Sequence, residues 1–261
     1  MSEYKEVFKR AEIKYLIGKN RYDELMQYLL TIARVDEYGL SSINNIYFDT
    51  ADYRLIRMSM DKPLYKEKLR LRTYGDTTDG SNSFIEIKKK YNGVVYKRRI
   101  PGRYRDTYDY LTGRGPMAGD SQVGREIEAF IKMYKGLKPA MMISYDRIAM
   151  IGIDDPEFRV TFDTNIRWTT RRMDLRVKNK GRQILEPEQY LMEIKVANAV
   201  PLELSQKLSE LGIFPVSFSK YGRGYADMIT LKENEGTSQG EVISYMGYID
   251  MNRRKGVVNY V

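Results

Sequence analysis

Residues 66–75, KEKLRLRTYG, show the pattern that most constrains the fold of this chain. Successive side chains of a β-strand point to opposite sides of a sheet. As a strand, the stretch therefore places four cations on one side: Lys66, Lys68, Arg70 and Arg72. The other side carries a half-apolar row that the rest of the protein can cover: Glu67, Leu69, Leu71 and Thr73. The fold must accommodate a row of like charges.

The same alternation recurs along the chain, so at least seven strands are predicted, each with one charged side. The other six are FKRAEIKYLI (8–17), SFIEIKKKY (83–91), VVYKRRI (94–100), MISYDRIAM (142–150), FRVTFDT (158–164) and YLMEIKV (190–196). Apolar residues at helical spacing predict amphipathic helices over 20–33, 124–134 and 201–211. Strands with a few helices indicate the α+β class.

Composition limits the chemistry. The 261 residues include no cysteine and no histidine, which excludes disulfides, thiolate metal sites and Ser-His-Asp triads. Phosphoryl transfer suits the remaining residue types, because it depends mainly on positioning, cations and a divalent metal. The net charge of +9 indicates an anionic partner: a nucleic acid, a phosphorylated metabolite or a membrane surface.

The length suits one large domain, predicted over residues 1–231. Residues 232–240, KENEGTSQG, have the composition of a linker, and the rest of 232–261 forms a tail. No apolar run is long enough to cross a bilayer, and the first residues lack the apolar region of a signal peptide. We therefore expect no transmembrane segment and a cytoplasmic location.

Two architectures could use such strands. In an ordinary sandwich, the charged sides face water and the apolar sides pack together. In a closed barrel, the charged sides face inward and the amphipathic helices cover the apolar outside. Solvated surfaces usually mix charges of both signs with neutral polar residues, whereas these rows consist mainly of Lys and Arg. The barrel is therefore favoured, with an anion such as a polyphosphate chain between the cations.

The chain resembles the VTC (vacuolar transporter chaperone) domain, the polyphosphate polymerase branch of the triphosphate tunnel metalloenzymes, a CYTH-like superfamily. Motifs that carry this resemblance run in order from residue 8 to 231: KRAEIKYLI, NNIYFDT, KLRLRTYG, FIEIKKK, VVYKRRI, SYDRIAM, RVTFDT, LMEIKV and SKYGRGYAD. It implies an antiparallel eight-stranded closed tunnel barrel with a charged interior and helices outside. It also implies an ATP-polyphosphate phosphotransferase that uses Mn²⁺ or Mg²⁺ to transfer the ATP γ-phosphate to inorganic polyphosphate.

The resemblance also implies roles for individual residues. Residues matching the family's catalytic cations are Lys14, Arg70, Arg72, Lys88, Arg147 and Arg159. Residues matching its substrate-binding positions are Lys97, Tyr145, Ser219 and Lys220. Glu193 matches the metal-binding glutamate. Arginines can clamp phosphate oxygens in pairs, and lysines can act as point charges along the phosphate chain.

One departure from the superfamily favours polymerisation over hydrolysis. Hydrolytic relatives begin with Glu-x-Glu-x-Lys, but here residues 10–14 read RAEIK, so an arginine replaces the first glutamate. Fewer carboxylates suit gripping a phosphate chain better than activating water. The alternatives are a tripolyphosphate or nucleoside-triphosphate hydrolase, and a non-catalytic module that binds polyanions or nucleic acid. We expect no nucleic-acid partner; export of product would require a separate membrane protein.

Several residues are expected to have structural roles. Glu12 and Glu86 should pair with neighbouring Lys or Arg instead of binding metal. Gly222 and Gly224, in KYGRGYAD, suggest a tight turn. Other charged positions are expected at the tunnel mouth or in solvent: Lys66, Lys68 and Lys90.

Overall fold

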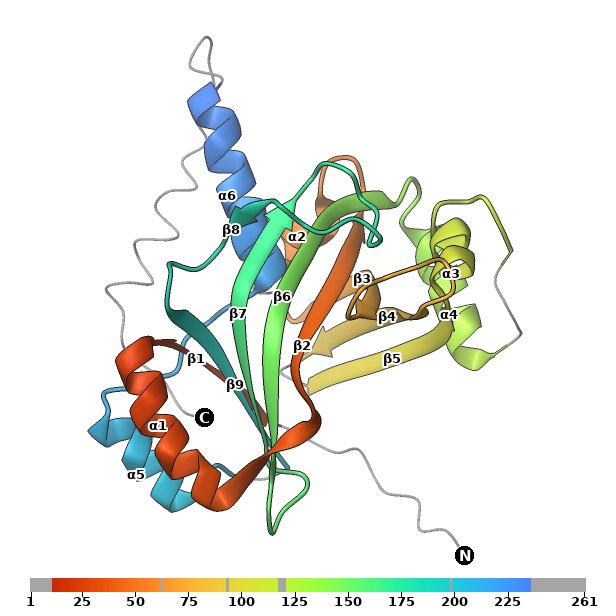
Figure 1. The fold of residues 1–261 in the computed structure, drawn as a ribbon. Coiled ribbons are helices and arrows are strands. Elements are labelled where there is room, and N and C mark those ends of the chain that lie inside the picture. The colour runs from red at the N-terminus through yellow and green to blue at the C-terminus, as the bar shows by residue number, and fades with distance from the viewer. Residues whose placement is uncertain (1–10, 62, 93, 117–120, 198, 236–261) are drawn as a thin grey trace, which may run out of the picture. The chain divides into compact units, whose positions relative to one another are not determined.

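The computed structural model describes residues 11–61, 63–92, 94–116, 121–197 and 199–235. Its strands form a single antiparallel sheet in the order β1-β9-β7-β6-β2-β3-β4-β5, with β8 paired to β7 (Figure 1). The strands are β1 (Ala11–Gly18), β2 (Ala33–Asp49), β3 (Tyr65–Tyr74), β4 (Asn82–Tyr91), β5 (Val94–Arg103), β6 (Lys138–Gly152), β7 (Arg159–Thr169), β8 (Arg182–Gln183) and β9 (Gln189–Val196). A sandwich of two sheets is therefore ruled out.

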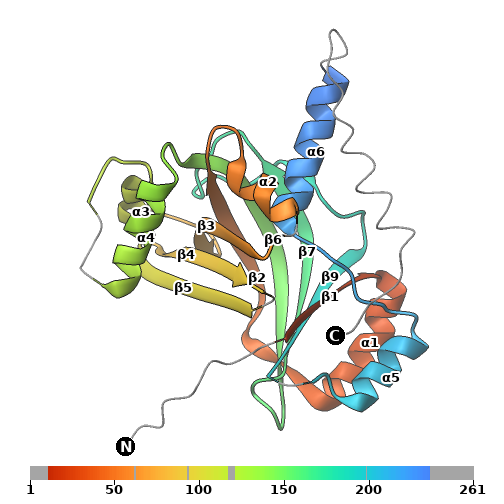
Figure 2. The same ribbon diagram turned by 180° about the vertical axis from the view of Figure 1, so that it is seen from behind.

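Six helices accompany the sheet in the described ranges. They are α1 (Lys19–Ile32), α2 (Arg54–Met60), α3 (Tyr104–Leu111), α4 (Gln122–Met133), α5 (Leu202–Glu210) and α6 (Lys220–Glu235). Figures 1 and 2 show α1 beside α5 near β1 and β9, and α3 beside α4 near β4 and β5. The whole sheet lies in the compact unit Met1–Asp227, and Met228–Val261 form a second unit.

The alternation predicted from sequence accounts for the two apolar clusters beneath the helices. One cluster joins α1 and α5 to the apolar positions of β1, β7 and β9: Tyr15, Ile17, Val160, Phe162, Met192, Ile194 and Val196. The other joins α3 and α4 to β3 and β4, through Leu69, Leu71, Ile85 and Ile87. In each of these strands the intervening residues carry the charges, so the predicted separation of charged and apolar sides is confirmed.

The sheet is strongly curled about its charged side. Strand β4 is six positions from β1 in the strand order, which would separate them by roughly 30 Å in a flat sheet. Instead, Lys88 Nζ on β4 lies 3.6 Å from Glu12 Oε2 on β1. The charges of distant strands therefore face one another.

The predicted closed eight-stranded barrel is wrong in one respect, because the sheet remains open between β1 and β5 within the described residues. The free edge of β1 is instead covered by the segment before α6. Val216 N donates to Lys14 O at 2.7 Å, and Tyr15 forms an isolated bridge with Pro215. This irregular segment occupies hydrogen-bonding groups that a closing strand would need.

The helices predicted over 20–33, 124–134 and 201–211 are confirmed as α1, α4 and α5, with ends that differ by one or two residues. Helices α2 and α3 lack a long apolar stripe and were not predicted. Each of the two helices comes after a strand or a turn in the chain, and tertiary contacts stabilise it. For example, Asp49 Oδ1 and Oδ2 accept the backbone N–H groups of Leu55 and Ile56 at the start of α2.

The predicted tight turn at Gly222 and Gly224 is wrong, because both glycines lie within α6. Gly224 is needed for close packing and not for a turn. A Cβ on Gly224 would lie 2.7 Å from Met141 Sδ and 3.2 Å from Trp168 Cβ. The helix can approach β6 and β7 this closely only without a side chain there.

The predicted linker also needs a correction, since α6 continues to Glu235 and includes its first four residues. The remainder of the linker and the tail lie outside the described residues. Every helix in the described ranges is too short or too polar to cross a lipid bilayer.

Substituting Gly224 should destabilise the fold. We expect Gly224→Val to lower the free energy of unfolding by roughly 1–3 kcal/mol, since the added atoms overpack the contact with Met141 and Trp168. Gly80→Val is the control, because a Cβ at Gly80 meets nothing within 4 Å; its effect should stay within about 0.5 kcal/mol. Urea unfolding measures both, and equal stabilities would contradict this packing role.

Candidate functional site

Charged and polar side chains of eight strands, of Ser219 and of the first residue of α6 meet on one side of the sheet, which we call the charged face. It consists of Glu12, Lys14, Asn45, Tyr47, Lys68, Arg70, Arg72, Glu86, Lys88, Lys97, Tyr145, Arg147, Thr161, Asp163, Glu193, Lys195, Ser219 and Lys220. Ten of the eleven predicted site residues belong to it; Arg159 is the exception described below.

The first group of contacts surrounds Glu86 on β4, whose side chain is almost completely buried. Its carboxylate lies 2.7 Å from Arg70 Nε, 2.7 Å from Lys97 Nζ and 3.8 Å from Arg72 Nε. Burial acts to raise the pKa of Glu86, but these three cations outweigh it and lower the pKa to about 2. Glu86 is therefore a shared counter-ion for the paired arginines, as expected from sequence.

The second group surrounds Asp163 on β7, which is completely buried. Arg147 donates to both carboxylate oxygens at 2.6 and 2.7 Å, and Lys220 Nζ lies 2.5 Å from Oδ2. Glu193 on β9 lies beside them, 3.4 Å from Lys220 Nζ and 3.9 Å from Arg147 NH2. Lys220 thus brings the first turn of α6 onto the charged face.

Tyr145 on β6 joins the two groups. Its hydroxyl accepts a hydrogen bond from Arg72 NH2 at 3.2 Å, and its ring lies 4.6 Å from Lys220 Nζ and 5.2 Å from the Arg147 guanidinium carbon. Burial acts to raise the pKa of the Tyr145 hydroxyl, but Arg72, Arg147 and Lys220 together lower it. The tyrosine therefore orients two arginines and a lysine around one point.

A third carboxylate, Glu12, connects the two ends of the sheet. Glu12 lies 2.7 Å from Lys14 Nζ on the same strand and 3.6 Å from Lys88 Nζ on β4. Burial acts to raise the pKa of Glu12, but Lys88 and Lys14 lower it to about 2. Its pairing with neighbouring lysines is as expected from sequence.

Lys68 was expected at the tunnel mouth or in solvent, and the structure corrects this. Its side chain is half-buried on the charged face, where Nζ donates to Ser219 Oγ at 3.1 Å. Burial and the neighbouring cations Lys88, Lys66, Lys14 and Arg70 lower the pKa of Lys68 to about 7. The alternation in KEKLRLRTYG already placed it beside Arg70.

Arg159 does not take part in the ion pairs and hydrogen bonds of the charged face. It is the first residue of β7, is exposed, and lies opposite Lys195 in the pairing with β9. Within the described parts of the chain it forms no ion pair. Arg159 is four residues from Asp163 along β7, so the two side chains lie on the same side of the strand. Arg159 is at the end away from Tyr145.

The sequence-based prediction missed Asn45, Tyr47 and Asp163. Asn45 Oδ1 accepts from Arg72 Nε at 2.8 Å, and Tyr47 OH accepts from Arg70 NH1 at 3.2 Å. All three stand at the alternate positions that carry the charged residues in NNIYFDT and FRVTFDT. The strand pattern could therefore have identified them as partners that hold the arginines.

Comparison with known families gives a match over most of the chain. The VTC domain family matches residues 9–229 of the 261. The chain belongs to the VTC domain family. The family predicted from the sequence motifs is thus confirmed.

A relative of this VTC domain is subunit 4 of the vacuolar transporter chaperone complex of Schizosaccharomyces pombe. The two are 26% identical over an alignment of 192 residues, and the match covers 61% of this chain and 26% of the Schizosaccharomyces pombe protein. This chain therefore matches about a quarter of the length of that subunit.

Two solved structures share the fold of this VTC domain. One is a candidate adenylate cyclase from Bacillus halodurans, with a TM-score of 0.50 and 15% identity over 82% of this chain and 94% of that chain. The other is a candidate adenylyl cyclase from Hippeastrum, described as having a dominant triphosphatase activity, with a TM-score of 0.50 and 15% identity over 83% and 95% of the chains. At this identity the likeness shows the fold alone.

Glu193, predicted to bind metal, has a suitable neighbour in Thr161. The two are paired across β7 and β9, and the buried Thr161 Oγ1 has no hydrogen-bond partner within the described residues. In the same part of the chain, no group of three or more Asp, Glu, His or Cys could hold a metal ion. These donors fit Mg²⁺ or Mn²⁺ only if substrate phosphate oxygens complete the coordination.

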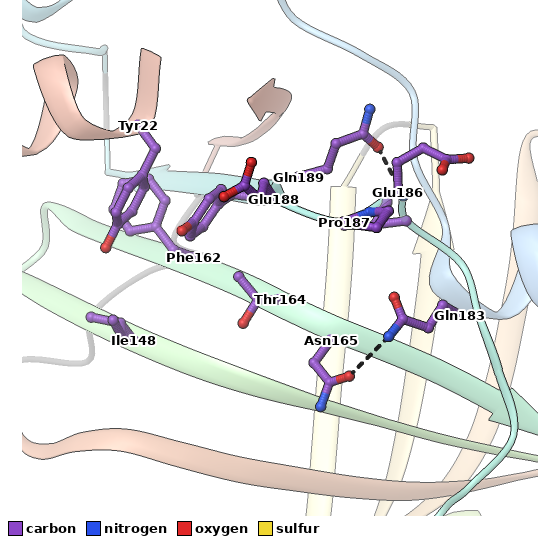
Figure 3. Close-up of a pocket in the computed structure, with 12 residues that line it drawn as sticks. Tyr22, Ile148, Phe162, Thr164, Asn165, Gln183, Glu186, Pro187, Glu188 and Gln189 are labelled. Atoms are coloured by element: carbon purple, nitrogen blue, oxygen red, sulfur yellow. Dashed lines mark hydrogen bonds between the residues drawn. The ribbon is translucent and has the colours of Figure 1, made fainter. Parts of the chain in front are cut away.

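The VTC domain also has a cavity of about 440 Å³ on the other side of the sheet. Figure 3 shows Tyr22 of α1 and Phe162 of β7 at one end and Asn165 with Gln183 at the other. None of the predicted site residues lines it. The charged face and this cavity are separate features.

Removing the buried carboxylate of Asp163 should strongly destabilise the VTC domain. Asp163→Asn leaves Arg147 and Lys220 buried with less compensating charge, so we expect the free energy of unfolding to fall by roughly 3–5 kcal/mol. The control Glu128→Gln removes an exposed pair with Lys132 and should cost less than about 1 kcal/mol. Urea unfolding measures both. A similar small change for the two variants would contradict the shared counter-ion role of Asp163.

The lowered pKa values of Glu12 and Glu86 predict a loss of stability in acid. Both carboxyls ionise near 4.5 when unfolded and near 2 when folded, so their contribution is complete above about pH 4.5 and is lost as the pH falls towards 2. Urea unfolding across this range should show the decline. Glu86→Gln should begin less stable and lose less with acid, whereas Glu128→Gln should follow the unmodified protein. Identical pH dependence for all three would contradict this assignment.

Proposed function

We propose that this VTC domain is a polyphosphate polymerase that transfers the γ-phosphate of ATP to the end of an inorganic polyphosphate chain. The cation excess on the charged face carries the proposal. The face brings together nine cations, namely Lys14, Lys68, Arg70, Arg72, Lys88, Lys97, Arg147, Lys195 and Lys220, and four carboxylates, Glu12, Glu86, Asp163 and Glu193. Five positive charges remain, which suits a ligand with several negative charges.

The face would bind the substrates in two zones. Around Tyr145, the guanidinium groups of Arg72 and Arg147 with the Lys220 ammonium converge from three elements, and we assign them to the transferring phosphate. Arg70 would contact the same substrate from the neighbouring position on β3. Arginine pairs hold phosphate oxygens in a fixed geometry and offset charge in the transition state.

The remaining lysines would guide the phosphate chain. Lys14 and Lys88 come from β1 and β4, so the curled sheet places cations on both sides of the path. Lys97 lies next along β5, and Arg159 lies at an exposed end of β7. We propose that the curl encloses the chain in a tunnel, although the sheet itself is open between β1 and β5 in its described part.

The reaction needs no histidine. The terminal phosphate oxygen of polyphosphate is already anionic and can attack the γ-phosphorus in line. A new P–O bond then forms at the chain end while the bond to the β-phosphate oxygen breaks, so ADP leaves and the chain gains one phosphate. The protein's cations position the two anions and offset the charge between them.

The pairing of Glu12 supports transfer to polyphosphate over transfer to water. Glu12 is engaged by both Lys14 and Lys88, and an arginine stands at residue 10. A carboxylate held by two ammonium groups is a weak base for activating water. This arrangement favours polymerisation.

A divalent metal fits the same site. Glu193 and Thr161 would hold Mg²⁺ or Mn²⁺ together with substrate oxygens, and the ion would neutralise charge on the β- and γ-phosphates. The expected partners are ATP and polyphosphate in the cytoplasm. A separate membrane protein would be required for export.

The test is to incubate the purified protein with ATP and Mn²⁺ and to separate the products by gel electrophoresis and orthophosphate assay. We expect long phosphate chains and ADP. Arg70→Ala and Glu193→Gln should each lower the polymerisation rate by about 100-fold or more. Arg105→Ala is the control, since the ion pairs of Arg105 with Asp79 and Asp109 are exposed and lie away from the charged-face contacts described above; its rate should be unchanged.

Each alternative gives a different result. Orthophosphate without chains would indicate a hydrolase. Salt-dependent polyanion binding with ATP left intact would indicate a non-catalytic module. Full activity of both site variants would contradict the assigned roles of Arg70 and Glu193.

A further inference from the structure

We propose that Lys68 and Ser219 form an additional phosphate subsite, which binds the polyphosphate chain away from the phosphate being transferred. The inference rests on the proposed function, since it identifies where a long phosphate chain is held. It assigns a role to Lys68, which the sequence motifs left outside the site.

The hydrogen bonds of Ser219 leave a donor directed at a ligand. Ser219 Oγ accepts from Lys68 Nζ at 3.1 Å and from Gly222 N at 3.2 Å. A hydroxyl oxygen can accept two hydrogen bonds and donate one, so both acceptor positions are used. The Ser219 O–H and the remaining N–H groups of Lys68 have no acceptor among the described residues. An anion would satisfy both groups.

The charges around Lys68 also indicate a missing anion. Each of the other eight cations of the charged face lies within 4.0 Å of a carboxylate. Lys68 has no such carboxylate in the described ranges. Lys66 and Arg70 flank Lys68 on β3, and Lys88 on the neighbouring strand β4 lies directly opposite it. Half-buried cations so placed repel one another, and a phosphate group among them would relieve that repulsion.

The lowered pKa of Lys68, about 7, agrees with this geometry. Burial and the cations Lys88, Lys66, Lys14 and Arg70 favour its neutral form while no ligand is bound. A bound phosphate favours the ammonium form and therefore raises the pKa. Binding should take up a proton above neutral pH.

The position along β3 separates this subsite from the site of transfer. Lys68 and Arg72 lie on the same side of the strand, four residues and about 13 Å apart. Arg72 contacts Tyr145 OH, in the zone assigned to the transferring phosphate. A chain of many phosphates can reach both positions, whereas a short anion held at Arg72 has fewer groups to offer Lys68.

The test compares Lys68→Met with the control Lys132→Met, which changes an exposed lysine of α4. Calorimetry without turnover measures the affinity for long-chain polyphosphate and for inorganic triphosphate. We expect Lys68→Met to weaken long-chain binding about tenfold and triphosphate binding by less than about twofold. The salt dependence of long-chain binding should fall by about one phosphate contact. Ser219→Ala should weaken long-chain binding about fivefold.

Proton uptake gives a second readout. Calorimetry above neutral pH, in buffers of different ionisation enthalpy, should show less proton uptake on long-chain binding for Lys68→Met than for the unmodified protein. Some uptake should remain, since burial and its cationic neighbours also lower the pKa of Lys97, to about 8. Thermal unfolding checks that the variant folds, which is expected because the substitution removes a repelling charge.

Equal losses for both ligands, or no loss for the long chain, would overturn the subsite. Because this measurement needs no turnover, its outcome is separate from that of the ATP assay. If no polymer is made but Lys68→Met selectively loses long-chain binding, the subsite stands and the polymerase proposal falls. If polymer is made and Lys68→Met binds normally, only the subsite falls.

Discussion

The charged face depends on a few buried carboxylates, each shared by several cations. Glu86 contacts three cations and Asp163 two, at distances of 2.5–3.8 Å. Removing such charges from water costs several kcal/mol for each ion, and only close, multiple pairing offsets that cost. The carboxylates therefore allow arginines and lysines to gather on one side of the sheet. They do not neutralise all of them, and this residual charge favours an anionic ligand.

The same contacts link the fold to the site. Glu12 and Lys88 connect strands that lie far apart in the sheet order, and Lys220 attaches the start of α6 to Asp163. Tyr221, the next residue, stacks on Tyr47 and donates to Asp49 at 2.9 Å. Asp49 in turn accepts the N–H groups that begin α2. Curling of the sheet and docking of these helices are thus stabilised partly by the groups that we assign to ligand binding.

Much of this arrangement could be predicted from residue alternation, because a strand fixes which side chains share a side. The rows containing Arg70, Glu86 and Glu193 followed directly from that rule, and so did the apolar clusters under the helices. The open sheet and helix α6 could not be predicted in this way. Pro215 and Val216 cover the edge of β1 through individual backbone contacts, and Gly224 of α6 serves tertiary packing. The local signal of Gly222 and Gly224 suggested a turn, whereas both lie in a helix, and close contact with Met141 and Trp168 explains the glycine at residue 224.

The spacing of the cations supports the proposed preference of the charged face for a phosphate chain over a single phosphate. Cations on the same side of one strand are about 7 Å apart, and neighbouring strands are about 4.8 Å apart. A compact anion can therefore contact only a few of them and leaves the others repelling one another. A linear polyanion passes successive cations and relieves the repulsion at each step. Under the proposed function, selection by length would follow from the strand geometry, without a binding pocket shaped for one small molecule.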